Sequence, residues 1–410
     1  MSAPVSLQSL RQWLWPAFDL PKPGGPHRIG TTWLVVKDDT RLERFSATPG
    51  ATRELPVKFW YPVPDDATGP TGLYAAPESV TVLFPLALNQ RLRRVKTHAI
   101  VDAPMAELRA PVLVFSHGYG GYAEQNTVQM EELASRGYVV ASIAHPGEAA
   151  WAPYPDGRGV AFAKQLNDAA KRRRRESKES VLALRRRHKR LLAALDSPDP
   201  AERLTRYREL LHLRGEPLFS ESVKEWTLDT KAVVDHLEAL DAGQLSSPFK
   251  GKLDMARLGV FGMSYGGATA VEFGRTDARC VAAANIDGLP YGGLLDSSIS
   301  VPLLVIAAAD EGHAGWVPGL DRCNGPTLLV NVPDTTHMGL TDLPLQMPPW
   351  LRWTGMGGRM PAARRGSIMN DLLVAFFDQH LLGRGAAAFA WLPKRYPELA
   401  WTARHLEQPS

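Results

Sequence analysis

The feature that constrains this chain most is the stretch LGVFGMSYGG at residues 258–267, with Ser264 at its centre. An apolar run leads into Gly-Met-Ser-Tyr-Gly, and small residues at helical spacing follow. The pattern G-x-S-x-G at a strand-to-helix turn holds a serine in a strained conformation that lifts its hydroxyl above a sheet. Ser264 is therefore the candidate nucleophile. The backbone N–H of Tyr265 is a candidate donor to the oxyanion that such an attack creates.

The segments around this turn alternate between apolar strands and helical patterns. Residues 111–115 (PVLVF) and 138–143 (YVVASI) are compact apolar runs, and a helical pattern to residue 135 separates them. Strand, helix and strand at this spacing indicate parallel neighbours. An earlier pair, 31–36 and 55–61, is expected to be antiparallel and to lie at a sheet edge. The predicted fold class is α/β, an α/β-hydrolase fold with a mostly parallel central sheet and helices on both faces.

The domain prediction is one α/β-hydrolase domain over residues 1–410, with residues 1–26 as an N-terminal extension. Residues 150–222 interrupt the pattern and predict a helical cap, after which a capping box at Ser222 is expected to begin the next helix. The insertion carries KRRRR at 171–175 and RRRHKR at 185–190. Such a basic helix face is either simply solvated, or it contacts an anionic membrane surface, an acidic partner or nucleic acid. The sequence does not predict a nucleic-acid partner, because no base-reading module accompanies the charge.

Two carboxylates and one histidine follow Ser264 at positions that suit a catalytic triad. Strands are expected at 280–286, 301–308 and 327–332, and the last of these is taken as the final strand. Asp287 follows the first, Asp310 the second, and His337 lies in the loop after the third. A serine needs a base, and the base needs an orienting acid. The order Ser, Asp, His is that of α/β-hydrolases, but spacing does not choose between Asp287 and Asp310.

A second oxyanion donor is expected in the glycine-rich loop SHGYGG at residues 116–121. Glycines allow a backbone to approach a ligand closely, and the loop after this strand supplies such a donor in α/β-hydrolases. We assign the role to the Tyr119 N–H. His117 is expected to orient the loop rather than to take part in catalysis.

The sequence predicts no cofactor and no metal. Cys280 and Cys323 are far apart, and no metal-ligand spacing occurs. No apolar run approaches the length of a membrane span, and residues 1–20 lack a secretory signal pattern. The expected location is cytoplasmic, with room for peripheral membrane association. A closing helix is expected over 368–382, and a shorter one over 82–94.

From about residue 27 to residue 382, apart from the basic insertion, the sequence resembles the plasma and intracellular type II platelet-activating factor acetylhydrolases and their bacterial relatives. The matching residues are Ile29-Gly30, Phe59-Trp60-Tyr61-Pro62, Val114-Phe115-Ser116-His117-Gly118, the turn around Ser264, Asn285-Ile286-Asp287-Gly288, and His337 with Asp342 downstream. The resemblance implies that Asp287 is the acid and that the Tyr119 and Tyr265 N–H groups form the oxyanion hole. Met263 and Tyr265 differ from the usual flanks of the family's serine, and the arginine-rich insertion is extra.

The function predicted from these features is a calcium-independent serine esterase that uses an acyl-enzyme. Its expected substrate is a short-acyl ester, such as the sn-2 ester of platelet-activating-factor-like phospholipids. Asp310 stays the alternative acid, because dienelactone hydrolases and cutinase-like polyesterases resemble this core and place their acid there. The alternative enzymes are such a polyesterase, a thioesterase and a peptidase. The alternative outside enzymes is a membrane- or nucleic-acid-binding protein with a vestigial triad.

Overall fold

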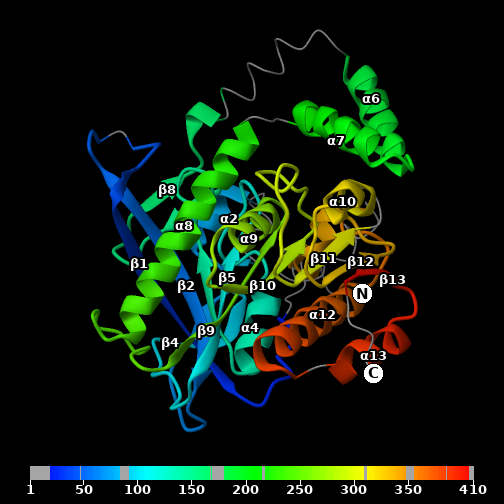
Figure 1. Cartoon of the computed structure of the whole chain (residues 1–410). Helices are drawn as coiled ribbons and strands as arrows, with labels where there is room; N and C mark the ends of the chain where they lie inside the picture. Colours follow the sequence, from blue (N-terminus) through cyan, green and yellow to red (C-terminus); the bar gives the residue numbers. More distant parts are fainter. Residues whose placement is uncertain are drawn as a thin grey trace, which may run out of the picture.

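Figure 1 shows the computed structural model of the chain. It describes residues 19–46, 48–83, 92–166, 168, 180–214, 218–308, 312–347, 355–384 and 386–405. Residues 1–18 of the predicted N-terminal extension, the basic run 171–175 and Asp310 therefore lie outside the described residues.

Within the described residues, eleven strands form one sheet in the order β13-β12-β11-β10-β9-β5-β6-β2-β1-β4-β3. These strands are β1 (Arg28–Leu42), β2 (Thr52–Val63), β3 (Thr71–Leu73), β4 (Lys96–Val101), β5 (Ala110–Ser116), β6 (Val139–Ile143), β9 (Leu253–Met263), β10 (Cys280–Ile286), β11 (Leu303–Ala308), β12 (Thr327–Val332) and β13 (Ala400–Arg404). The run from β6 to β12 is parallel throughout. The predicted mostly parallel α/β fold is confirmed.

Helices cover both faces of this sheet (Figure 1). The α-helices and 3₁₀ turns are α2 (Pro77–Leu83), α4 (Thr127–Ser135), α6 (Val181–Ala193), η1 (Ala194–Asp196), α7 (Pro200–Arg214), α8 (Leu218–Asp241), α9 (Tyr265–Thr276), α10 (Gly312–Leu320), η2 (His337–Leu340), α11 (Leu343–Gln346), α12 (Ala362–Leu382) and α13 (Ala386–Arg395). Side chains alternate along each strand, so β5 sends Val112 and Val114 to the core under α8 and α9. It sends Leu113 and Phe115 to the core under α4 and α12.

Helices α6 and α7 form the cap, which lies above the body of the domain close to α10 (Figure 1). Leu195, Tyr207 and Leu210 of the cap are buried in one cluster with Trp226 of α8 and Tyr265 of α9. The insertion is not helical from its start, because β7 (Trp151–Pro153) and β8 (Gly159–Ala161) form a two-stranded hairpin there.

Several predicted boundaries were wrong. The helix expected to begin at Ser222 begins at Leu218. Its first turn packs the partly buried Phe219 ring against the rings of Tyr119 and Tyr265. Helix α2 (Pro77–Leu83) begins with a proline, which is well accepted in the first turn of a helix. Most of the helix expected at 82–94 lies outside the described residues, so that expectation stays a prediction. The pair β1 and β2 is antiparallel as predicted but lies inside the sheet, and β13 adds an antiparallel strand after the expected last one.

No helix in the described part of the chain combines the length and the apolar character that crossing a bilayer requires.

Candidate active site

The turn after β9 holds Ser264 in a left-handed conformation, with φ of 56° and ψ of −114°. Its backbone N–H donates to the carbonyl of Ile286 at 2.6 Å, which ties the turn to β10. A Cβ on Gly266 would lie 1.9 Å from the Ser116 carbonyl oxygen, and one on Gly262 would lie 2.2 Å from the Gly266 backbone. Both positions therefore require glycine, and the strained serine persists because its neighbours fix the turn.

Asp287 and His337 form a hydrogen-bonded pair beside this turn. The Asp287 Oδ2 atom lies 2.6 Å from His337 Nδ1, and its Oδ1 accepts from the Ala308 N–H at 2.7 Å. Asp287 is nearly buried, whereas the His337 ring is partly exposed. The two oxygens of Asp287 thus have separate roles. Oδ1 fixes the orientation of the carboxyl group, and Oδ2 holds the imidazole of His337.

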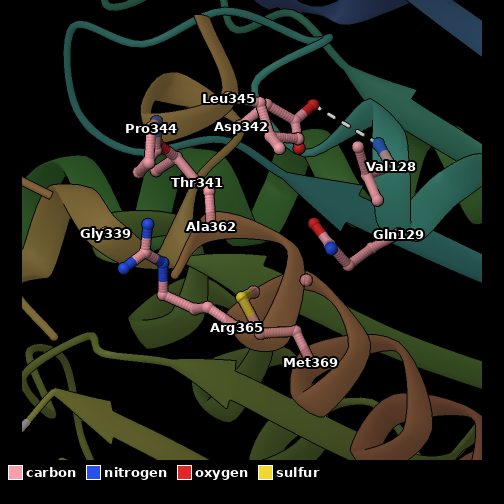
Figure 2. A pocket seen from close by; sticks show the side chains of 11 residues that line it. Val128, Gln129, Gly339, Thr341, Asp342, Pro344, Leu345, Ala362, Arg365 and Met369 are labelled. Carbon is pink, nitrogen blue, oxygen red and sulfur yellow. Dashed lines mark hydrogen bonds between the residues drawn. The ribbon is translucent and has the colours of Figure 1, made fainter. Parts of the chain in front are cut away.

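The loop that carries His337 is held from behind by Arg365 and Asp342. Arg365 of α12 donates to the carbonyls of Gly357 and Met360 and to Thr335 Oγ1, and its burial lowers the pKa to about 10. Burial also raises the pKa of Asp342, whose Oδ2 accepts from the Val128 N–H. Figure 2 shows the hollow between these side chains. Its volume is about 10 Å³, so it holds at most one water molecule and is no substrate site.

In the loop after β5, one backbone N–H group is a candidate hydrogen-bond donor to the oxyanion. The N–H groups of Gly118, Gly120 and Gly121 donate to Gln125 Oε1, the Glu148 carbonyl and the Gly118 carbonyl. Among the described residues, none accepts a hydrogen bond from the Tyr119 N–H. Tyr265 is the first residue of α9, so its N–H has no acceptor within that helix. Both N–H groups therefore fit the predicted role of oxyanion donors.

A pocket of about 320 Å³ contains the candidate residues. Its lining residues are Tyr119, Leu192, Leu210, Arg214, Phe219, Ser264, Tyr265, Asp287, Leu289, Tyr291 and His337. The structure thus brings together Ser264, Asp287, His337 and both tyrosines that the sequence singled out. Asp310 lies outside the described residues. The cap helices α6 and α7 contribute Leu192, Leu210 and Arg214, so they form part of the pocket wall.

A model of the family described as platelet-activating factor acetylhydrolase, isoform II, matches residues 15–384. The chain belongs to this family. The platelet-activating factor acetylhydrolase of Cavia porcellus is 28% identical over 375 residues, which cover 88% of this chain and 78% of that protein. That of Gallus gallus is 26% identical over 384 residues, which cover 89% and 84%.

A solved structure, the ferulic acid esterase from Streptomyces cinnamoneus, is also similar. It aligns with a TM-score of 0.71 and 27% identity, and the alignment covers 94% of this chain and 99% of that one. The family match confirms the resemblance seen in the sequence. Together with the esterase neighbour, it supports an ester hydrolase.

Sequence reasoning missed several features of this acetylhydrolase-family site. Phe219 and Tyr291 line the pocket, and Arg214 adds a positive charge to its wall. Nothing in the local pattern of α7, of α8 or of the segment after β10 distinguishes these side chains from ordinary apolar or surface positions. A buried cluster around His145 and Asp229 was also missed, because its members are far apart in the sequence.

Proposed function

We propose that this protein is a serine carboxylic-ester hydrolase that works through an acyl-enzyme. Ser264 Oγ attacks the ester carbonyl while the His337 ring takes its proton. The tetrahedral intermediate then collapses, and the alcohol leaves with that proton. Water, deprotonated by the same ring, attacks the acyl-enzyme and releases the acid and the free serine. The Tyr119 and Tyr265 N–H groups stabilise each oxyanion, and such a donor contributes roughly 3–4 kcal/mol.

The observation that supports this mechanism most is the hydrogen bond of 2.6 Å between Asp287 and His337 beside a pocket that they share with Ser264. An ionised carboxylate only accepts hydrogen bonds, so His337 donates through Nδ1 and keeps Nε2 as the proton acceptor.

For the substrate, we propose a short-acyl ester such as the sn-2 ester of platelet-activating-factor-like phospholipids. The named relatives support this choice, and so does the pocket. Its leucines and aromatic rings suit the apolar parts of a lipid, and the Arg214 guanidinium adds a positive charge that attracts a phosphate group.

A second candidate substrate is an ester with an aromatic acyl group. Four aromatic rings, those of Tyr119, Phe219, Tyr265 and Tyr291, line the pocket and contact one another edge to face or tilted, with centroids 5.2 to 6.1 Å apart. The pocket volume of about 320 Å³ exceeds what an acetyl group fills. The similar Streptomyces cinnamoneus protein, which is named a ferulic acid esterase, supports this candidate.

A substrate panel separates these candidates. We expect kcat/KM to be highest for a short sn-2 ester of a phosphate-bearing glycerolipid. The other members of the panel are p-nitrophenyl esters of rising chain length, methyl ferulate, a thioester, a peptide amide and a polyester film. Preference for methyl ferulate would move the assignment to aromatic acyl esters. Preference for the thioester, the amide or a polyester film would identify one of the other hydrolases. No turnover of any substrate would point to a binding protein.

We further propose that the cap contacts an anionic membrane through α6. The exposed side chains of this helix include Arg186, Lys189 and Arg190 and the apolar Leu182. Leu192 of the same helix lines the pocket. A basic helix face with an apolar side chain suits an anionic lipid surface. In this protein the basic face of α6 lies next to the pocket that we assign to a lipid ester.

Co-sedimentation with lipid vesicles tests this contact. We expect binding to phosphatidylcholine vesicles only when phosphatidylglycerol is added, and weaker binding as ionic strength rises. Each basic side chain at such a surface contributes about 1 kcal/mol, so changing Arg186, Lys189 and Arg190 to glutamine should weaken binding by about 100-fold. The matched control changes three exposed lysines elsewhere, namely Lys96, Lys231 and Lys250. An equal loss in both triple variants would argue against a docking role for α6.

A further inference from the structure

A buried charged cluster centred on Asp229 of α8 takes no part in the proposed chemistry. Asp229 is fully buried, and its carboxylate accepts from Arg53 Nε at 3.1 Å, Arg53 Nη2 at 2.7 Å and Arg41 Nη2 at 2.8 Å. Burial alone would raise the pKa of Asp229, but Arg53 and the neighbouring His145 hold it below its ordinary value. Asp229 is therefore an ionised carboxylate in a fixed position inside the protein.

The His145 ring joins this cluster to the strand that leads into the oxyanion loop. Its Nδ1 lies 2.8 Å from Asp229 Oδ2, and its Nε2 lies 3.1 Å from Ser116 Oγ. The ring stacks on Trp226 with a centroid distance of 3.8 Å. Burial lowers the pKa of His145 to about 4, so the ring is neutral near pH 7. Because the Asp229 carboxylate accepts a hydrogen bond from Nδ1–H, Nε2 carries no proton, and the Ser116 hydroxyl donates to it.

A second chain of hydrogen bonds runs from His145 into the loop itself. The His145 backbone N–H donates to His117 Nε2 at 3.2 Å, and His117 Nδ1 donates to the Gly118 carbonyl at 2.7 Å. His117 is fully buried, and burial together with His145 lowers its pKa to about 3, so this ring is neutral as well. The chain ends at the peptide unit whose N–H belongs to Tyr119. That is the N–H that we assign to the oxyanion hole.

Ser116, His145 and Asp229 are the residue types of a catalytic triad, but a substrate has no access to them. Ser116 is 3% exposed, and the other two are fully buried. None of the three lines the pocket that holds Ser264. A substrate carbonyl therefore cannot reach Ser116, and the arrangement must act on the structure around it.

We propose that His145 is a positioning residue that sets the orientation of the Tyr119 N–H in the oxyanion hole. Its ring fixes the side chain of Ser116, and its backbone fixes His117, so both residues before Gly118 depend on it. Asp229 and Trp226 hold the ring in turn. The inference rests on the proposed esterase function, because only an oxyanion-forming reaction uses this N–H.

The test uses substitutions of His145 that each keep the hydrogen bond made by one ring nitrogen and remove the other. His145→Asn keeps a donor near the Nδ1 position for Asp229 but removes the acceptor for Ser116 Oγ. His145→Gln places an amide oxygen near the Nε2 position and restores that acceptor. Ser116→Ala removes the same hydrogen bond from the other side. Ser135→Ala is the matched control, since its buried hydroxyl donates to the Glu132 carbonyl and accepts from the Gly25 N–H, away from the loop.

The readout is the affinity of an alkyl trifluoromethyl ketone. The Ser264 oxygen adds to its carbonyl carbon, His337 takes the hydroxyl proton, and a hemiketal oxyanion forms. Loss of a whole oxyanion donor costs about 10²–10³ in kcat. A misplaced donor costs less, so we expect His145→Asn and Ser116→Ala to lower kcat about 10- to 100-fold and to weaken the ketone by the same factor, with KM unchanged. His145→Gln should recover most of the loss. The double variant of Ser116→Ala with His145→Asn should be no worse than either single one, because both remove one interaction.

The inference is overturned if the variants lose thermal stability as Ser135→Ala does while kcat and ketone affinity stay at the wild-type values. It is also overturned if all variants lose kcat but not ketone affinity. Failure of the proposed function has a different signature, because the wild-type protein itself would then neither hydrolyse esters nor bind the ketone covalently.

Discussion

Ser264→Ala abolishes ester turnover, with an expected loss of about 10⁶ in kcat, as found when the nucleophile of a serine hydrolase is removed. The loss is this large because His337 and Asp287 act only through the serine oxygen. The Ser264→Ala variant should fold, because alanine adopts the positive φ of 56° at this position no less readily than serine does. No side-chain hydrogen bond caps α9 at this position, so the helix loses none.

Two measurements check this expectation. Steady-state hydrolysis of p-nitrophenyl acetate gives the turnover, and labelling with a fluorophosphonate reports the reactive serine directly. Wild-type protein should be labelled stoichiometrically and Ser264→Ala not at all. The exposed Ser246 provides a matched control, since Ser246→Ala should keep full turnover and full labelling. Retained labelling in Ser264→Ala would mean that another residue is the nucleophile.

The centre of the fold could be predicted because its strands are buried on both faces. In β5, β6 and β11 every residue is buried, so the sequence shows continuous apolar runs with a clear beginning and end. Ser264, Asp287 and His337 each follow such a run. Since parallel strands end at one edge of a sheet, their convergence could also be predicted.

What the sequence did not predict depends on contacts between distant segments. The partners Arg53 and Asp229 are 176 positions apart, and His145 lies between them. Each of the three is unremarkable within its own strand, loop or helix, and only the packing of α8 against the sheet brings them together. The same holds for the cap, since the pattern of α7 predicts a buried stripe but not that Leu210 would face a pocket. The cytoplasmic location stays a prediction.

The second large effect is expected at the acid of the triad. Asp287→Asn should lower kcat by about 10⁴. Asparagine has nearly the same shape, and its Oδ1 can still accept from the Ala308 N–H, so the loop after β10 should keep its conformation. The amide group, however, presents N–H donors to His337 Nδ1 where the carboxylate presented an acceptor. The ring must then carry its proton on Nε2, which leaves no acceptor for the Ser264 proton.

Asp310→Asn is the comparison that gives this result its meaning. Asp310 follows β11 as Asp287 follows β10, and both positions suit an α/β-hydrolase. We expect Asp310→Asn to keep kcat close to the wild-type value. The reverse pattern, a large loss at Asp310 and a small one at Asp287, would assign the acid to Asp310.

In either case, labelling by a fluorophosphonate should slow in parallel with kcat, because the same imidazole activates Ser264 toward the ester and toward phosphorus. A variant that loses turnover but labels at the wild-type rate would have lost substrate binding instead. Comparing the two rates in both variants therefore separates the orienting carboxylate from one that only shapes the pocket.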